Sequence, residues 1–232
     1  MGYAPLPIEE SRWPQIARFI RGPLESLYFR DVHDLLRLPQ REAGLTGGCN
    51  FAIAHLLLSA VSGVSNVLYA AGTGDSGYQS AFSNMLVRFY PWDTEDEAPQ
   101  NVAKKQALAD VLWAEYRAPL VHPLGLWAGA TPGGTRSALE RGHLIRCRRI
   151  GGTEGNGLSD SDLERLERSA DWPFETFGET LQIRDDAAVL KLERFYWGVR
   201  QAVLRLVADW VLADQAEAVL ARRLEPDPKA RA

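Results

Sequence analysis

An arginine and a histidine stand five positions apart in the stretch RAPLVH, Arg117–His122. The guanidinium of arginine is permanently charged and can hold a phosphate through two parallel hydrogen bonds. The imidazole of histidine exchanges a proton near neutral pH. Together the two side chains supply much of what cleavage of RNA by its own 2′-hydroxyl requires. Arg117 and His122 are therefore the candidate catalytic residues.

A second pair of the same kind is formed by Arg136 and His143 in RSALERGH. This pair lies among glycines and ahead of a predicted strand. Arg117, in contrast, directly follows a predicted helix over residues 101–116. In this helix Ala107, Val111, Leu112 and Tyr116 recur near helical spacing. The first pair is preferred, and the second remains the alternative.

The Arg-x4-His spacing after a core helix resembles the motif of the HEPN superfamily, many of whose members are metal-independent ribonucleases. The resemblance covers about residues 49–126, and a helix over 187–213 would join the same bundle. It implies an endoribonuclease that acts by transphosphorylation in toxin, defence or RNA-processing biology. It also implies a homodimer that pairs two motifs, an RNA substrate and a cognate regulatory protein.

The chain departs from the HEPN pattern in two ways. HEPN nucleases often carry a polar residue directly after the arginine, where this chain has Ala118. Pro119 and Pro123 also disfavour helix at the residues before them, so the pair is expected on a turn. A structural interpretation stays open, in which Arg117 caps a helix C-terminus and His122 is an ordinary core or loop residue. The matching alternative function is a non-catalytic HEPN-like bundle that binds a partner protein or nucleotide.

The composition is that of an ordinary globular protein. Its 232 residues suffice for one large domain, and 46% hydrophobic with 24% charged residues excludes a disordered chain. A net charge of −4 argues against indiscriminate coating of nucleic acid, though not against a local basic site. Two cysteines are too few for a disulfide framework, and no apolar leader precedes Pro14, so the sequence predicts a cytoplasmic protein. No metal-ligand or cofactor motif occurs, and we expect neither a metal nor a cofactor.

One segment is long and apolar enough to span a bilayer, since residues 43–74 contain no Asp, Glu, Lys or Arg. Polar residues nevertheless recur in it at helical spacing and form one stripe: His55, Ser59, Ser62 and Asn66. No Lys/Arg cluster or aromatic belt marks its ends. We therefore predict a central bundle helix over 50–69 and no membrane insertion. Further helices are predicted over 11–38, which Pro23 should kink or split, and over 78–89.

Residues 143–150 have the pattern of a strand, with residues 180–183 as a partner, which predicts a small two-stranded ribbon. Four arginines gather here as candidate RNA-binding residues: Arg141, Arg146, Arg148 and Arg149. A solvated charged face is the alternative. Cys147 stands between arginines and is either a thiol of lowered pKa or an ordinary strand cysteine.

Late in the chain apolar residues recur in steps of three and four and predict a long amphipathic helix over 187–213: Val189, Leu192, Tyr196, Val199, Val203, Leu206 and Trp210. This seam and the polar stripe together offer more helix surface for packing than one bundle of this size readily buries, which again favours a homodimer. The fold expected is mainly α, a helical bundle with a small two-stranded β-ribbon insertion. Residues 1–221 would form one domain with an insertion over 127–184, followed by a disordered tail at 222–232.

Overall fold

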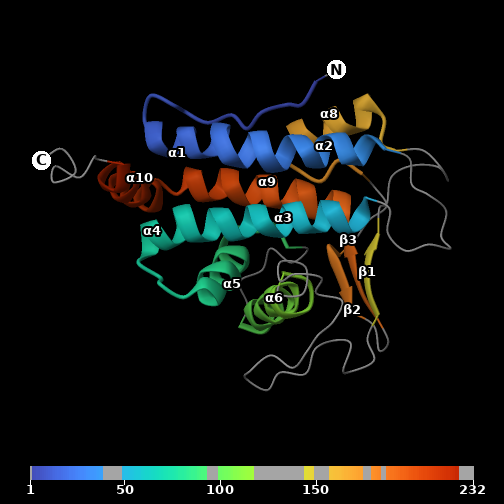
Figure 1. The fold of residues 1–232 in the computed structure, drawn as a ribbon. Helices are drawn as coiled ribbons and strands as arrows, with labels where there is room; N and C mark the ends of the chain where they lie inside the picture. The colour runs from blue at the N-terminus through green and yellow to red at the C-terminus, as the bar shows by residue number, and fades with distance from the viewer. Residues whose placement is uncertain are drawn as a thin grey trace, which may run out of the picture.

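The computed structural model describes residues 2–38, 49–92, 99–117, 144–148, 157–174, 179–183 and 187–224. Over these residues the protein is mainly helical, as the sequence predicts. Three long helical segments lie side by side in Figure 1, with the helices Tyr78–Phe89 and Pro99–Val111 and a small sheet below them and the helix Asp160–Arg168 above them.

The first long segment contains Pro23 without being split by it. It consists of α1 (Pro14–Phe19), a π-helical stretch η1 (Ile20–Phe29) and α2 (Arg30–Arg37), which follow one another directly. Proline lacks a backbone N–H and its ring clashes with the carbonyl four residues earlier, so it disrupts an ordinary α-helix. The wider π-helical turns at this position let the helix continue past Pro23.

The uncharged segment forms the second long helix, made of α3 (Asn50–Val64), η2 (Ser65–Tyr69) and α4 (Ala70–Thr73). It packs against η1, α2 and α9 as well as against α5 and the element that ends at Arg117. Its length and composition alone would allow it to cross a membrane, but half of its most apolar window is buried in the protein. These contacts confirm the prediction of a central bundle helix.

The second segment ends at Gly74, whose φ of 75° lies in the left-handed region that glycine adopts readily. Helix α5 (Tyr78–Phe89) follows, as predicted, and packs against α6 (Pro99–Val111). Helix α6 continues into a second π-helical stretch, η3 (Leu112–Arg117). The predicted helix over 101–116 is therefore present and delivers Arg117 at its last position.

Among the described residues the sheet has three strands, β1 (Leu144–Arg148), β2 (Leu181–Ile183) and β3 (Ala187–Lys191), in the order β1-β3-β2. The two predicted strands exist, and β2 forms an antiparallel ribbon, but its partner is β3 rather than β1. Strand β1 pairs with the other edge of β3 in parallel, with Cys147 opposite Leu190. The assignment of 187–191 to a helix was wrong, because a run of five residues fits both the helical and the strand period. Its burial alternates as in a strand: Ala188 and Leu190 are buried, while Val189 and Lys191 are less so.

The third long segment, helix α9 (Leu192–Ala208), is almost wholly buried and contains most of the predicted seam. The seam ends earlier than predicted, because Asp209 closes α9 and its carboxylate accepts a hydrogen bond from the backbone of Leu212. Trp210 is therefore not part of the seam: it begins α10 (Trp210–Leu224) and is 61% exposed.

Two expectations are affected by this arrangement. The seam of α9 is covered within the chain, so it offers no face to a second copy, and the homodimer stays a prediction. Helix α10 reaches Leu224, so residues 222–224 are helical rather than part of a disordered tail.

Candidate functional site

Arg117 lies at the end of η3 with its guanidinium directed at the central helix. Its Nε donates a hydrogen bond to Oγ of Ser62, 3.3 Å away. Its Cζ lies 4.4 Å from the ring centroid of Trp113, one turn earlier on η3. A residue from the predicted polar stripe and an aromatic ring thus hold the candidate catalytic arginine from two sides.

The helix that carries Arg117 is fixed by its neighbours in the chain. Tyr116 is fully buried and its hydroxyl donates to the backbone oxygen of Ala188 in β3, at 2.7 Å. The ring of Trp113 meets that of Phe82 on α5 edge-on, with centroids 5.2 Å apart. Leu112 is buried as well. Packing in the core therefore fixes the rotation of η3 about its axis, and this rotation fixes the direction of Arg117.

Partial burial lowers the pKa of the Arg117 guanidinium, which remains a cation at neutral pH. Among the described residues, no carboxylate lies within ion-pair distance of it. Asp110, two turns earlier on the same helical segment, instead accepts hydrogen bonds from Ser83 and Gln106 at 2.9 Å each. Arg117 is thus a half-buried positive charge that the described part of the protein does not neutralise.

The predicted polar stripe lies on one side of the central helix. Its four members are all half-buried, whereas the residues on the opposite sides of α3 are fully buried. Asn66 donates from Nδ2 to the backbone oxygen of Ser62 at 2.7 Å. The stripe therefore lies next to Arg117 and contacts it through the hydroxyl of Ser62.

The remaining candidate residues are placed only in part. His122, Arg136, Arg141, His143 and Arg149 lie outside the described residues.

Arg146 and Arg148 belong to β1, of which the backbone is described. Strand β1 is tied to the start of the central helix, because Nδ2 of Asn50 donates to the backbone oxygen of Cys147 at 3.1 Å. Asn50 and Ser62 are twelve positions apart on one helix, or about 18 Å at 1.5 Å per residue. The central helix thus joins the Arg117 site to the arginine-rich strand.

Cys147 is an ordinary strand cysteine. Burial raises the pKa of its thiol to about 12, which leaves almost no thiolate at neutral pH. The proximity of arginines in the sequence did not lower its pKa, because removal of the thiol from water dominates.

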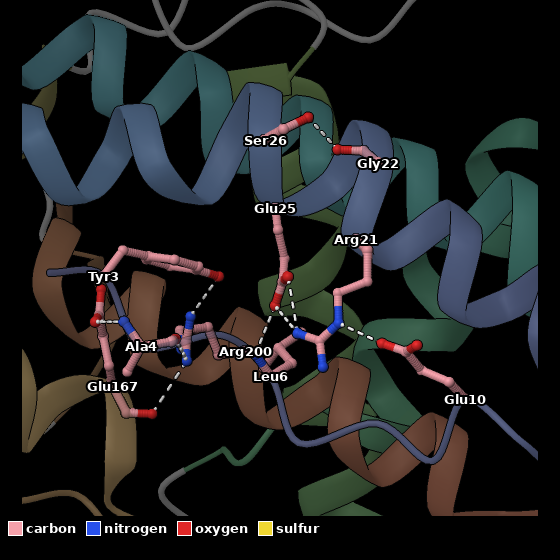
Figure 2. Close-up of polar contacts among 10 residues, drawn as sticks. All are labelled: Tyr3, Ala4, Leu6, Glu10, Arg21, Gly22, Glu25, Ser26, Glu167 and Arg200. Atoms are coloured by element: carbon pink, nitrogen blue, oxygen red, sulfur yellow. Dashed lines mark hydrogen bonds and ion pairs between the residues drawn. The ribbon is translucent and has the colours of Figure 1, made fainter.

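The structure also contains a buried polar cluster that the sequence analysis did not find (Figure 2). At its centre, Glu167 of α8 (Asp160–Arg168) accepts hydrogen bonds at one carboxylate oxygen from Nδ1 of His33 at 2.8 Å and from the hydroxyl of Tyr196 at 2.7 Å. Its other oxygen accepts from the backbone N of Ala4 at 2.8 Å. Arg200 of α9 donates to the backbone oxygens of Ala4 and Glu167 at 2.7 and 3.1 Å.

The cluster continues along the N-terminal arm, which comprises residues 2–13. Glu25 of η1 accepts a hydrogen bond from the backbone N of Leu6 and pairs with Arg21 at 3.0 Å. Arg21 in turn pairs with Glu10 of the arm at 3.2 Å. Figure 2 shows the arm running past Glu167 and Glu25. The cluster therefore fastens the arm to α8, α9 and η1.

This cluster is closed to ligands, because Glu25, His33, Glu167 and Arg200 are each at most 7% exposed. Its role is to hold elements together. One sequence signal pointed to it: Arg200 follows Tyr196 by four positions and so shares its face of α9, where a charge needs a buried partner. The partner could not be identified from sequence, since Glu167 lies on a separate short helix.

Within the described residues, no three His, Cys, Asp or Glu side chains are placed to hold a metal ion. No protein-family model, curated protein or solved structure matches the chain.

Proposed function

We propose that the protein is a metal-independent endoribonuclease, with Arg117 and His122 as its catalytic pair. The observation that carries the proposal is the state of Arg117: a half-buried guanidinium, stacked on Trp113, with no carboxylate partner in the described part of the chain. A buried charge is costly unless something pairs with it. A phosphate of bound RNA is the anion that this arrangement suits.

The geometry favours this function over a capping role for Arg117. An arginine that caps its own helix donates to the last carbonyl oxygens of that helix. Arg117 instead donates to Ser62, on a different helix. Its side chain is thereby held over the polar stripe rather than over the end of η3.

The reaction proposed is transphosphorylation. The 2′-hydroxyl of RNA attacks the adjacent phosphorus, the bond from phosphorus to the 5′-oxygen breaks, and a 2′,3′-cyclic phosphate and a 5′-hydroxyl result. The proton lost by the 2′-oxygen is balanced by one gained at the 5′-oxygen. His122 serves as general acid or base for one of these transfers, and Arg117 neutralises charge that builds on the phosphoryl oxygens.

The proposal includes the context that the resemblance implies. The second acid or base comes from the motif of a second copy in a homodimer, the location is cytoplasmic, and the role lies in toxin, defence or RNA-processing biology. Arg146 and Arg148 on β1, with Arg141 and Arg149, would bind flanking phosphates, since β1 adjoins the central helix.

The test is cleavage of end-labelled RNA by the purified protein in EDTA. We expect activity in the wild type and its loss in Arg117→Ala and in His122→Ala, with the products ending in 2′,3′-cyclic phosphate. Arg136→Ala and His143→Ala are matched controls and should cleave like the wild type. DNA, and RNA with a 2′-O-methyl group at the scissile position, should resist cleavage.

Three results would contradict this assignment. Cleavage that requires a metal ion would exclude the mechanism. Loss of activity in the Arg136 and His143 variants, but not in the Arg117 and His122 variants, would mean that the second motif is the catalytic pair. A wild type without activity on any RNA would favour the non-catalytic bundle that binds a partner protein or nucleotide.

A further inference from the structure

We infer that Ser62 is a positioning residue, which orients the guanidinium of Arg117 so that both Nη groups face one phosphate. This inference rests on the proposed function. Ser62 would not touch RNA itself, and it would act through Arg117 alone.

The argument begins with the donors of the guanidinium. It carries five N–H groups, one on Nε and two on each Nη. The Nε–H is taken by Oγ of Ser62. Within the described residues, neither Nη group has a hydrogen-bond partner. The four free donors form the planar fork that matches two oxygens of one phosphate.

The occupied Nε also selects one mode of binding. Arginine can grip an oxyanion through Nε and one Nη, or through its two Nη groups. Because Nε already donates to Ser62, only the second mode remains. The phosphate would therefore sit at the tip of the side chain, on the side away from the central helix.

Trp113 fixes the remaining freedom of the guanidinium. Its ring covers one face of the guanidinium at 4.4 Å, and its own orientation is set by the contact with Phe82 at 5.2 Å. The cation–π contact keeps the guanidinium beside the ring, and the hydrogen bond turns its Nε towards the central helix. Neither contact alone would direct the fork.

Ser62 is itself held firmly in place. Its backbone oxygen accepts side-chain hydrogen bonds from Ser65 at 3.0 Å and from Asn66 at 2.7 Å. It stands just before the π-helical stretch η2, in the most central helix of the fold. An acceptor on such a rigid helix is well suited to position a catalytic group.

The test compares Ser62→Ala with Ser59→Ala, which removes the same hydroxyl from the same stripe but has no bond to Arg117 among the described residues. We expect Ser62→Ala to lower kcat/KM by about tenfold to a hundredfold, as misplacement of a group that holds the scissile phosphate does. Ser62→Thr, which keeps the hydroxyl, should recover most of the rate, and Ser59→Ala should cleave like the wild type. Equal rates for Ser62→Ala and the wild type would overturn the inference.

A double-mutant cycle separates positioning from a direct role. Binding of a non-cleavable 2′-O-methyl RNA is measured for Ser62→Ala, Arg117→Ala and the double variant. If Ser62 acts through Arg117, Ser62→Ala weakens RNA binding when Arg117 is present and has no effect on RNA binding in the Arg117→Ala background. An undiminished effect in that background would mean that Ser62 contacts RNA by itself, contrary to the inference.

A third measurement does not depend on enzymatic activity. In protein with 15N-labelled arginine, the Nε–H of Arg117 should exchange slowly with water in the wild type and quickly in Ser62→Ala. If the wild type cleaves no RNA, the proposed function fails while this exchange still tests the bond. If exchange is equally fast in both proteins, the positioning role fails even for an active enzyme.

Discussion

His33 and Glu167 meet at 2.8 Å in the protein interior, although they are 134 positions apart in the chain. The same carboxylate accepts hydrogen bonds from Tyr196 and from the backbone of Ala4. One side chain of α8 therefore joins α2, α9 and the N-terminal arm. Buried charges of this kind stabilise a fold only while every partner is present.

The first prediction is that Glu167→Gln strongly destabilises the protein. A glutamine offers one oxygen and one NH2 group, so at least one of the three donors around position 167 would face another donor. Arg200, which is 1% exposed, would also lose the nearby negative charge. We expect the free energy of unfolding to fall by about 3–5 kcal/mol, the range found when a buried ion pair is broken. Urea denaturation measures the change.

A matched control lies on the same helix. Glu164 pairs with Arg168 at 3.1 Å, but both side chains reach solvent. Glu164→Gln should therefore change the stability by less than about 0.5 kcal/mol, as is typical for an exposed pair. Similar losses of unfolding free energy in both variants would mean that the buried cluster stabilises the fold no more than an exposed ion pair does.

The second prediction concerns the pH dependence of stability. Burial by itself raises the pKa of Glu167, but hydrogen bonds from His33, Ala4 and Tyr196 and the charge of Arg200 outweigh it, so the pKa lies below its ordinary 4.5. An unfolded chain then takes up the proton first as the pH falls. The stabilising contribution is complete above pH 4.5 and is lost as the pH drops below it.

The stability difference between wild type and Glu167→Gln should therefore shrink on acidification below this pH. Urea denaturation of both proteins along a pH series measures it. A difference that stays constant or widens towards acid would contradict the direction of the pKa shift.

The helices could be predicted because their apolar residues repeat over long stretches. Residues 50–69 and 78–89 are clear cases, since a helical period sustained over several turns fits no other element. The strand at 187–191 was missed for the opposite reason, because five residues show too little of either period. Trp210 was assigned to the seam by spacing alone, and no pattern revealed that Asp209 would end the helix there.

The candidate site could be predicted only through single residues. Arg117 and Ser62 were each noticed, one in a motif and the other in a stripe, yet their contact depends on how η3 packs on α3. Glu167 and His33 gave no signal, because a buried polar cluster forms from unrelated elements and leaves no period in the sequence. Tertiary packing decides such contacts, and local patterns do not contain it.

The third prediction compares two helical glycines. A Cβ at Gly198 would lie 2.3 Å from the ring of Tyr90, which cannot easily move because its hydroxyl is hydrogen-bonded to Thr180 at 2.8 Å. Gly198→Ala should therefore destabilise the protein by about 1–3 kcal/mol, the usual effect of overpacking. At Gly63 the nearest atom would be Phe19 at 3.9 Å, an ordinary contact. Gly63→Ala should raise the stability by about 0.5–1 kcal/mol, because alanine favours helix.

Thermal unfolding of both variants measures the two effects. An increase in Tm for Gly198→Ala would show that α9 can shift away from Tyr90, contrary to the close packing described above.

The fourth prediction is that Cys147 reacts slowly in the folded protein. With a pKa of about 12 against an ordinary 9.0, its thiolate fraction at mildly alkaline pH is roughly a thousandfold lower than that of a free thiol. In a Cys49→Ser variant, labelling by a thiol-disulfide reagent should be slow in buffer and fast in denaturant. Comparable rates under the two conditions would show that the thiol is accessible and ionises normally.

The fifth prediction separates stability from activity at two adjacent positions. Tyr116 is fully buried and donates to the backbone of Ala188, so Tyr116→Phe leaves that oxygen without this donor. The variant should lose about 1–3 kcal/mol of stability and keep its cleavage of RNA. Arg117 is half-buried and its Nη groups have no described partners, so Arg117→Ala should lose cleavage while its stability changes by less than about 1 kcal/mol. Urea denaturation and the RNA assay, applied to both variants, measure the two quantities. If Arg117→Ala unfolds as readily as Tyr116→Phe, or if it still cleaves, Arg117 is a structural residue and the catalytic assignment is wrong.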